Sequence, residues 1–227
     1  MSDDFDLLTH QLRPARERPQ GALVLLHGRG TNEFDLLPLL DELDPERRLV
    51  GITPRAPLEL APGGFHWYIS RQVGYPDPKT FDSSYVTLTR WLDALPEALG
   101  VSWSQTVLGG FSMGAVMSYA LGLGAGRPAP AGILALSGFM PTVPGFELDL
   151  SDREGFRVAI GHGSEDPVIS VEFSRAARRR LEQAGANVLY RESPMMHGVD
   201  PHFLPVLCSW ITHVMQAVAS HRGSRAG

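Results

Sequence analysis

The fold is decided by residues 105–123, which read QTVLGGFSMGAVMSYALGL. Residues 105–108 form a short apolar run typical of a buried strand, and residues 113–123 have the apolar spacing of a helix. Between them lies a G-x-S-x-G motif with Ser112 at its centre. A serine in this context predicts a sharp turn that exposes the hydroxyl at the carboxyl end of a sheet. Ser112 is therefore a candidate nucleophile, and a chance glycine-rich turn is the alternative.

Outward from this stretch, short apolar runs alternate with longer segments of helical spacing. Runs without polar alternation are typical of strands buried on both faces, as in a parallel sheet covered by helices. The alternation therefore predicts an α/β fold with a doubly wound, mostly parallel sheet and helices on both faces. The expected strands are 22–26, 49–52, 106–108, 133–136, 158–160 and 188–190, and the expected helices are 32–43, 83–99, 113–123, 171–184 and 203–218.

Two segments stand outside this alternation. Residues 5–12 are expected to form an antiparallel strand at one edge of the sheet. Residues 53–80 hold five prolines, three glycines and the aromatic run Phe65-His66-Trp67-Tyr68. A loop this long in a compact domain is usually functional or disordered, and its aromatic content favours an ordered one.

Composition excludes several classes of protein. The chain has 227 residues, a formal net charge of −5 and one cysteine. Its length predicts one or two domains with a substantial core. One cysteine cannot form an internal disulfide or a cysteine-based zinc or iron–sulfur site, and no metal-binding motif is present. Mild acidity gives no electrostatic reason to expect nucleic acid as a partner.

The ends of the chain carry the expectations about location. The acidic start, MSDDFD, lacks the basic and apolar regions of a signal peptide. No stretch has the roughly 20 consecutive apolar residues of a membrane span. We therefore expect a soluble, cytoplasmic protein without a membrane span. Residues 220–227 are small and basic and are expected to form a frayed tail.

A serine hydroxyl needs a base within hydrogen-bond reach, and the base needs an orienting acid. In this fold class the three groups follow one another as Ser, Asp or Glu, and His. Asp166 follows a predicted strand, and Glu165 in the same loop is the alternative. His197 follows the last predicted strand at the entry to the final helix, and the other histidines fit this order or position less well. Since these residues must share one site, a single domain is expected over residues 1–219.

Attack on a carbonyl creates an oxyanion, which needs fixed hydrogen-bond donors. One expected donor is the backbone N–H of Met113, directly after the nucleophile. The other is assigned to the N–H of Arg29, in the loop HGRGTN at 27–32. A dinucleotide-binding loop is excluded because the third glycine of that motif is missing. The Arg29 side chain either faces solvent or meets an anionic group of the substrate.

The expected substrate pocket is lined by aromatic and flexible apolar side chains. Trp67 and Tyr68 offer rigid apolar surface with a polar tip. Phe139 and Met140 follow a predicted strand and so reach the same end of the sheet. The alternative is that the aromatic residues form a satellite hydrophobic cluster under the long loop.

Six motifs occur in the order in which they stand in one known family. They are LHGRG at 26–30, WY at 67–68, GFSMG at 110–114, LSGFMP at 136–141, HGSEDPV at 162–168 and HG at 197–198. Over nearly its whole length the chain resembles the phospholipase/carboxylesterase family of α/β-hydrolases, which includes bacterial carboxylesterases and acyl-protein thioesterases.

The resemblance implies an α/β-hydrolase fold with no separate cap domain and no cofactor. It also implies that Ser112, Asp166 and His197 form a triad. Arg29 and Met113 match the oxyanion donors of the family, and Trp67 matches a wall of its pocket. Some members form dimers, so the resemblance allows a homodimer.

Together these observations predict a serine carboxylesterase that acts on small-molecule esters with short to medium acyl chains through an acyl-enzyme. The absence of sequence for a lid is the reason to expect short chains. An acyl thioesterase or lysophospholipase would share all of these residues. A dienelactone-hydrolase-like lactonase typically has a cysteine where Ser112 stands. A non-catalytic binding module on the same fold would need a broken triad, whereas all three members are present.

Overall fold

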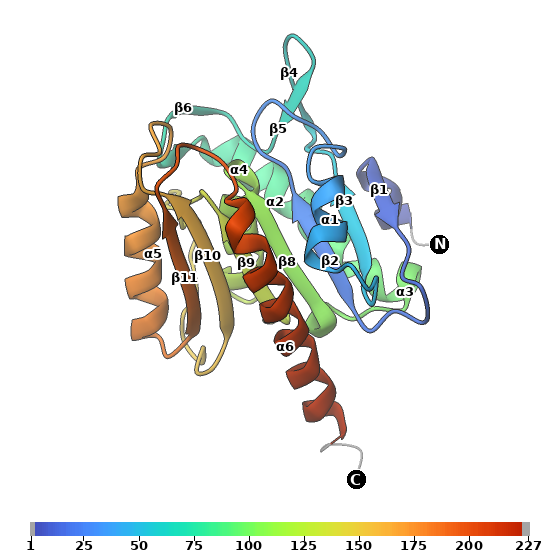
Figure 1. The fold of residues 1–227 in the computed structure, drawn as a ribbon. Helices are drawn as coiled ribbons and strands as arrows, with labels where there is room; N and C mark the ends of the chain where they lie inside the picture. The colour runs from blue at the N-terminus through green and yellow to red at the C-terminus, as the bar shows by residue number, and fades with distance from the viewer. Residues whose placement is uncertain (1–2, 224–227) are drawn as a thin grey trace.

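The core of the fold is a seven-stranded sheet in the order β1-β3-β2-β8-β9-β10-β11, seen in a computed structural model that describes residues 3–223 (Figure 1). The edge strand β1 runs antiparallel to β3, and all other neighbours pair in parallel. The predicted doubly wound, mostly parallel sheet is confirmed. Its strands are β1 (His10–Arg13), β2 (Ala22–Leu26), β3 (Val50–Pro54), β8 (Thr106–Phe111), β9 (Gly132–Leu136), β10 (Arg157–Gly163) and β11 (Asn187–Ser193).

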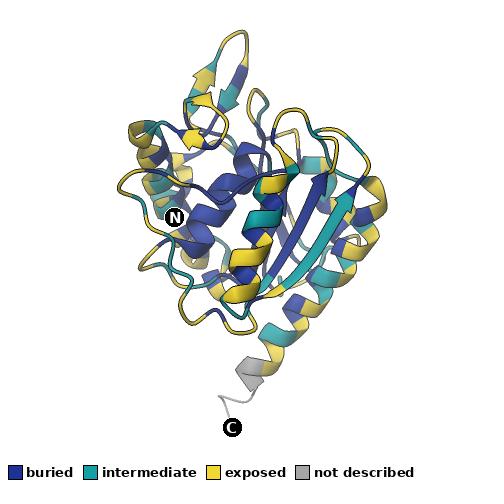
Figure 2. Ribbon diagram, turned by 90° about the vertical axis from the view of Figure 1, so that its left-hand side faces the viewer, coloured by how far each residue is buried: buried dark blue, intermediate teal, exposed yellow. Residues whose placement is uncertain are grey.

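Helices cover both faces of this sheet. On one face α4 (Met113–Leu123) packs against the central strands, flanked by α2 (Pro78–Asp93) and α5 (Val171–Gln183). The other face is covered by α1 (Leu37–Leu43) and α6 (Leu204–Gly223). Every residue of β2, β3 and β9 is buried, and α4 is buried along its whole length (Figure 2). Burial on both faces explains why these strands show no polar alternation in the sequence.

Two predicted helices differ from the structure at their ends. The helix expected over 83–99 starts earlier, at α2, where Asp77 Oδ1 accepts the N–H of Thr80 at 2.9 Å. It breaks at Ala94, and α3 (Leu95–Leu99) follows, because Pro96 cannot donate to the preceding turn. The helix expected from residue 32 starts only at Leu37, because Asn32 Oδ1 accepts the N–H of Phe34 and forms a turn instead.

The N-terminal segment was expected to be one strand over 5–12. It forms a short 3-10 helix (Asp3–Leu7) followed by β1. The Phe5 ring stacks on Trp91 of α2, with ring centroids 5.8 Å apart. An aromatic anchor on a helix therefore replaces strand pairing in the first half of the segment.

The long segment over 53–80 is ordered and contains two small hairpins. The first joins β4 (Leu58–Leu60) and β5 (Gly64–His66), and the second joins β6 (Ser70–Gln72) and β7 (Tyr75–Pro76). Figure 1 shows both near the carboxyl ends of the parallel strands. The N–H of Gly30 donates to Phe65 O at 2.8 Å, and the N–H of Phe65 donates to Thr31 O at 2.9 Å. The first hairpin is thereby tied to the loop after β2.

The last helix, α6, is longer and more apolar than expected. Residues 201–220 are long and apolar enough to cross a membrane by length and composition. In the structure Leu207, Ile211 and Val214 pack into the core with the sheet and α1, so one face of this helix is part of the hydrophobic core, and most of the remaining residues of 204–220 are partly or fully exposed. The expected tail over 220–227 starts inside α6, and residues 224–227 lie outside the described part of the chain.

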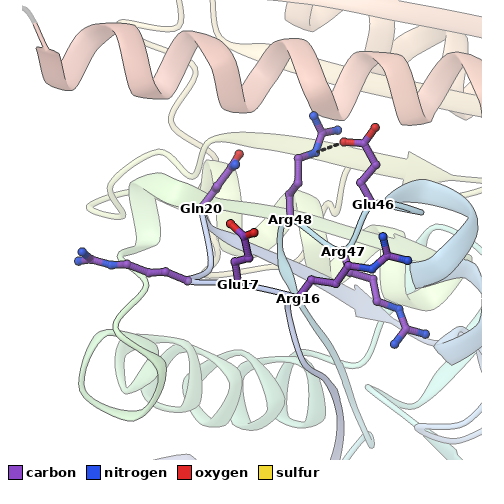
Figure 3. Close-up of a pocket in the computed structure, with 7 residues that line it drawn as sticks. Arg16, Glu17, Gln20, Glu46, Arg47 and Arg48 are labelled. Atoms are coloured by element: carbon purple, nitrogen blue, oxygen red, sulfur yellow. Dashed lines mark ion pairs between the residues drawn. The ribbon is translucent and has the colours of Figure 1, made fainter.

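The amino ends of the parallel strands carry a cluster of paired charges. Arg13, 6% exposed, contacts Asp44, 1% exposed, with Nη2 and Oδ2 2.6 Å apart. Beside this pair lies a hollow of about 340 Å³ that is lined by charged and polar side chains (Figure 3). Its arginines alternate with carboxylates, and Arg48 pairs with Glu46 across it at 3.5 Å. The lining residues are Arg16, Glu17, Arg18, Gln20, Glu46, Arg47 and Arg48.

Candidate active site

Ser112 lies at the turn between β8 and α4, at the carboxyl end of the middle strand of the sheet. Its backbone has φ 54° and ψ −116°, a conformation that non-glycine residues rarely adopt. A Cβ atom on Gly114 would collide with the backbone carbonyl of Leu26, and one on Gly110 would collide with the backbone of Gly114. The close approach of β2, β8 and α4 therefore explains both glycines of the G-x-S-x-G motif.

A chain of hydrogen bonds links Ser112, His197 and Asp166. His197 Nε2 lies 3.0 Å from Ser112 Oγ, and His197 Nδ1 lies 2.6 Å from Asp166 Oδ2. Because an ionised carboxylate only accepts hydrogen bonds, the proton belongs on Nδ1. Nε2 is then free to accept the proton of the serine hydroxyl. The structure thus brings the three predicted triad residues together in the required order.

The loop that carries Asp166 is bonded to the loop that carries His197. The N–H of Ser164 donates to Ser193 O at 2.8 Å, and the N–H of Glu165 donates to Met195 O at 3.1 Å. The side chain of Glu165 is exposed, whereas that of Asp166 is 0% exposed and meets His197. Between the two candidate acids, the geometry favours Asp166.

The Asp166 carboxylate is held by donors on both oxygens. Oδ1 accepts the N–H of Val168 at 2.8 Å and that of Ile169 at 2.9 Å, while Oδ2 faces His197. Burial opposes ionisation of this carboxyl, but the hydrogen bonds from His197, Ile169 and Val168 outweigh it and hold the pKa below its usual value. Asp166 is therefore charged at neutral pH and can stabilise a protonated His197.

A second histidine, His162, contacts the same carboxylate. Its Nε2 lies 3.2 Å from Asp166 Oδ2 and 2.8 Å from Ile169 O, and its Nδ1 lies 2.5 Å from Ser174 Oγ. Two acceptors face Nε2, so the proton belongs there, and Nδ1 accepts from the serine. Burial lowers the pKa of His162, which favours the neutral ring. His162 is thus a neutral donor behind the acid, a contact that the sequence analysis did not predict.

The loop after β2 is built as a rigid support next to Ser112. His27 Nε2 accepts the N–H of Ala56 at 3.0 Å, so its Nδ1 carries the proton and donates to Gly28 O at 2.7 Å. Trp67 Nε1 donates to His27 O at 2.8 Å. A Cβ atom on Gly28 would lie 3.6 Å from the Cβ of Ser112. The backbone of this loop therefore runs directly past the nucleophile.

Both expected oxyanion donors have the backbone setting that such a role requires. Within residues 3–223 the N–H of Arg29 donates to no protein acceptor. Met113 is the first residue of α4, and N–H groups in the first turn of a helix have no partner inside the helix. Both groups border the cavity that contains Ser112. The helix dipole of α4 adds a partial positive charge at the same end.

A cavity of about 340 Å³ opens beside Ser112. Two of the four predicted pocket residues line it, namely Tyr68 and Phe139. The prediction for Trp67 and Met140 is corrected, since neither lines the cavity: Trp67 Nε1 donates to His27 O, and Met140 packs with Ala115 and Tyr119 of α4. The full lining consists of Arg29, Tyr68, Ser70, Arg71, Gln72, Val73, Ser112, Met113, Phe139, Val168 and Ile169.

Some supporting residues of the site have only weak sequence signals. The Phe111 ring lies 4.8 Å from the His197 ring, and Ser137 Oγ donates to Gly198 O at 2.9 Å next to the base. The sequence signal for both is that Phe111 lies inside the motif GFSMG and Ser137 inside LSGFMP. His27 directly follows the predicted strand 22–26, and His162 stands two residues after the predicted strand 158–160. Both are thereby placed near the site, but neither is given a role.

The arrangement has the chemistry of acyl transfer. It offers a serine oxygen that borders a cavity, an imidazole base in contact with it, a buried ionised acid and backbone N–H groups beside the same cavity. Ser112 is 8% exposed, so its oxygen is reached only through the cavity. Among residues 3–223, no group of three or more His, Cys, Asp or Glu side chains is arranged to hold a metal ion.

Comparison with known proteins shows that the chain is similar to a family of hydrolases. A family model described as phospholipase/carboxylesterase matches residues 9–215. The putative hydrolase MhqD of Bacillus subtilis is 30% identical over 165 residues, covering 73% of this chain and 79% of MhqD. Acyl-protein thioesterase 1 homolog 1 of Dictyostelium discoideum is 24% identical over 175 residues, covering 73% and 77%.

Solved structures show the same fold over almost the full length. The carboxylesterase from Bacillus cereus superposes with a TM-score of 0.80 at 25% identity, covering 91% of this chain and 94% of that protein. The carboxylesterase from Mesorhizobium loti gives a TM-score of 0.79 at 21% identity, covering 91% and 95%. The seven-stranded sheet and its helices are therefore an α/β-hydrolase fold.

Proposed function

The chain belongs to the phospholipase/carboxylesterase family of hydrolases, and we propose that it is a serine carboxylesterase acting through an acyl-enzyme. The observation that carries the proposal is the hydrogen-bonded chain from Asp166 through His197 to Ser112, which ends in a cavity open to a ligand. A hydroxyl in contact with a neutral, oriented imidazole is the arrangement that nucleophilic catalysis requires.

In the first half of the reaction, Ser112 Oγ attacks the ester carbonyl while His197 Nε2 takes its proton. Asp166 stabilises the resulting imidazolium through Nδ1. The N–H groups of Arg29 and Met113 hold the negative charge that develops on the carbonyl oxygen. His197 then returns the proton to the leaving alcohol, and the acyl group remains on Ser112.

In the second half, water takes the place of the alcohol. His197 Nε2 removes a proton from the water as its oxygen attacks the acyl carbonyl. The same backbone N–H groups hold the second oxyanion, and the proton returns to Ser112 Oγ as the carboxylic acid leaves. One ester and one water are consumed, and one acid and one alcohol are released.

The cavity supports a preference for short to medium acyl chains. Its volume of about 340 Å³ lies at the lower end of the usual range for small-molecule sites. Tyr68, Val73, Phe139, Val168 and Ile169 supply apolar surface for an acyl chain. A long chain would have to continue over the surface of the protein.

The proposal is tested with para-nitrophenyl esters of increasing acyl length. We expect turnover of short and medium esters, a decline for long ones and loss of turnover in Ser112→Ala. Glu165→Gln is the control for Asp166→Asn, because the Glu165 side chain is exposed. No ester hydrolysis, or hydrolysis unchanged by Ser112→Ala, would contradict the proposal. A larger loss in Glu165→Gln than in Asp166→Asn would contradict the assignment of the acid.

Thioester hydrolysis is the second candidate, since the same groups would perform it. It is supported by the relative named as an acyl-protein thioesterase homolog. Measuring thiol release from acyl thioesters against alcohol release from oxygen esters of the same acyl group separates the two. A higher kcat/KM for the thioester in every such pair would favour the second candidate.

For the location of the enzyme we propose the cytoplasm. Cys208 is a free, partly buried thiol, and the chain has no other cysteine. Unpaired cysteines are usual where thiols are kept reduced. Cell fractionation with an activity assay would test this.

A further inference from the structure

The charged residues that line the cavity beside Ser112 all carry the same sign. Arg29 and Arg71 are its charged residues, and none of its lining residues is acidic. The chain as a whole has a net charge of −5, so this excess of positive charge is local. On this basis we propose that the natural ester carries a second, anionic group, in the simplest case a carboxylate, which binds between Arg29 and Arg71. The inference rests on the proposed esterase function.

Both guanidinium groups are free to take up such a ligand. Within the described residues, neither Arg29 nor Arg71 makes a hydrogen bond or an ion pair. Other arginines form ion pairs within the protein, as Arg55 does with Glu33 and Arg13 with Asp44. An unpaired guanidinium presents a planar set of donors that matches a carboxylate.

The groups around the two arginines do not cancel their charge. His66 faces Arg29, and burial together with the charge of Arg29 lowers the pKa of His66, so its ring is neutral. Asp77 is the acidic neighbour of Arg71. Its carboxylate already accepts the N–H and hydroxyl of Thr80, at 2.9 Å and 2.8 Å, as the cap of α2.

The two arginines reach the cavity from two separate, anchored loops. Arg29 lies in the loop after β2, and its N–H is a proposed oxyanion donor, so its side chain starts next to the place of the substrate's ester carbonyl. Arg71 lies on the β6–β7 hairpin, which is fixed by the bond from Asp77 N–H to Ile69 O at 2.8 Å. A Cβ on Gly74 would lie 3.1 Å from the Phe173 ring of α5, so the hairpin rests on that helix. The backbone at both arginines therefore has a defined place relative to Ser112, and both side chains border the same cavity.

The remaining lining suits the rest of such a molecule. Val73, Phe139 and Val168 are apolar, while Ser70 and Gln72 add neutral polar groups beside Arg71. An ester with an apolar body and a carboxylate at some distance from its carbonyl would place each part against matching surface. A neutral alkyl ester would leave both guanidinium groups unused.

The other arginine-rich hollow does not share these properties. At the amino ends of the strands, Glu17 and Glu46 stand among the arginines (Figure 3). Arg47 pairs with Asp41 at 3.1 Å, and Arg48 pairs with Glu46. This hollow lies at the opposite end of the sheet from Ser112. The side chains of Arg16 and Arg18 are unpaired within the described residues, so removing their charge is a matched control for removing that of Arg29 and Arg71.

The test compares anionic esters with neutral amides of the same shape. Para-acetoxybenzoate and para-acetoxybenzamide place the group on the alcohol side. Monoethyl adipate and its terminal amide place it on the acyl side. We expect kcat/KM for the anionic member to exceed that of the neutral one by about tenfold in at least one pair. Added salt should reduce this ratio, because the arginines are exposed.

Variants assign the preference to the two arginines. Arg71→Gln should lower the ratio, and Arg29→Gln/Arg71→Gln should bring it close to one. Arg16→Gln/Arg18→Gln removes the same charge from the remote hollow and should leave the ratio unchanged. Neutral esters turned over as fast as anionic ones, or a preference that survives the Arg29→Gln/Arg71→Gln change, would overturn the inference while leaving the esterase intact.

Equilibrium binding separates this inference from the proposed function. Ser112→Ala protein is titrated with the anionic and the neutral member of each of the two pairs, so no turnover is needed. Tighter binding of the anion in at least one pair, lost in the protein that also carries Arg29→Gln/Arg71→Gln, supports the inference even if no ester is hydrolysed. Equal binding of anion and amide in both pairs overturns it, whatever the turnover.

Discussion

The two ends of the sheet both bury charge, but they do so for different purposes. At the amino ends, Arg13 and Asp44 are 6% and 1% exposed. The guanidinium also donates to Leu40 O at 2.7 Å and Leu49 O at 2.9 Å, and Asp44 Oδ2 accepts the N–H of Leu49 at 3.0 Å. The pair is enclosed by protein and ties β1, α1 and β3 together.

At the carboxyl ends, the hydrogen bonds of the buried charge continue to an oxygen that borders a cavity. Asp166 is as well enclosed as Asp44, but its hydrogen bond to His197 continues to Ser112, which opens into a cavity. The hydrogen bonds of the Arg13–Asp44 pair end within the protein and hold its elements together, whereas the hydrogen bonds that start at Asp166 end at an oxygen that a ligand can reach. The setting of the arginines differs in the same way. No acidic residue lines the cavity that holds Arg29 and Arg71, whereas Glu17 and Glu46 stand among the arginines at the amino ends.

The largest effect is expected at Ser112, where the hydrogen-bonded chain from Asp166 ends. Ser112→Ala should lower kcat for para-nitrophenyl esters by about 10⁵-fold or more, because no nucleophile remains. The free energy of unfolding should not fall, since the serine backbone is strained and its side chain supports nothing else. Steady-state kinetics and urea unfolding on one preparation check both statements. A large loss of stability would contradict the comparison, because it would show that Ser112 also stabilises the fold.

Removing the charge of Asp166 should have the next largest effect. Asp166→Asn keeps the shape of the side chain but no longer favours the proton on His197 Nδ1, so kcat should fall by about 10³- to 10⁴-fold. Glu165→Gln, one residue earlier and exposed, is the matched control and should stay close to the unaltered enzyme. Equal losses in the two variants would show that the fold of the loop, and not the charge, is being measured.

At the amino ends of the strands, the expected effect is on the free energy of unfolding. Asp44→Ala removes the buried counterion of Arg13 and leaves only the half-exposed Asp41, 3.3 Å away, so it should cost about 3 kcal/mol of unfolding free energy. Turnover per folded molecule should be unchanged, because the pair lies at the opposite end of the sheet. Asp41→Ala breaks the half-exposed contacts to Arg47, at 3.1 Å, and to Arg13, at 3.3 Å. It should change stability less, because the buried Asp44 still pairs with Arg13. Turnover that falls in proportion to stability would show that the two ends are coupled.

The smallest expected effect concerns pH. His27, His66 and His162, all at the carboxyl end, have pKa values lowered by burial from the usual 6.5. The unfolded chain therefore binds protons near pH 6.5 that the folded protein refuses, so stability falls as pH drops through that value and is full above it. Urea unfolding at a series of pH values measures this slope. His66→Leu, which removes one of the three rings, should flatten it, and a steeper slope would contradict the assignment.

Much of the carboxyl end could be predicted from the sequence, because its residues carry local signals. The strand, the G-x-S-x-G turn and the helix around Ser112 are contiguous, and the positions of Asp166 and His197 follow from strand ends in a fixed order. Sequence order alone could not choose between Asp166 and Glu165. That choice depends on the backbone bond from Glu165 to Met195, which turns one side chain outward.

The parts that could not be predicted depend on which way a side chain points in an irregular segment. Trp67 and Tyr68 are adjacent in the sequence, but Trp67 bonds to His27 O in the core while Tyr68 lines the cavity. Met140 likewise turns into the core next to Phe139. The contact of His162 with Asp166, four residues away, depends on how the loop between them turns. The pairing of Arg13 with Asp44 joins elements that no local pattern connects.

The most direct test of the central claim is covalent labelling of the nucleophile. The protein is incubated with a fluorophosphonate, which bonds to activated serine oxygens with loss of fluoride, and the adduct is located by peptide mass spectrometry. We predict one adduct per chain, on Ser112, with turnover lost in step with labelling and no adduct in Ser112→Ala. Turnover that persists in fully labelled protein, or an adduct on another residue that abolishes turnover, would contradict the account.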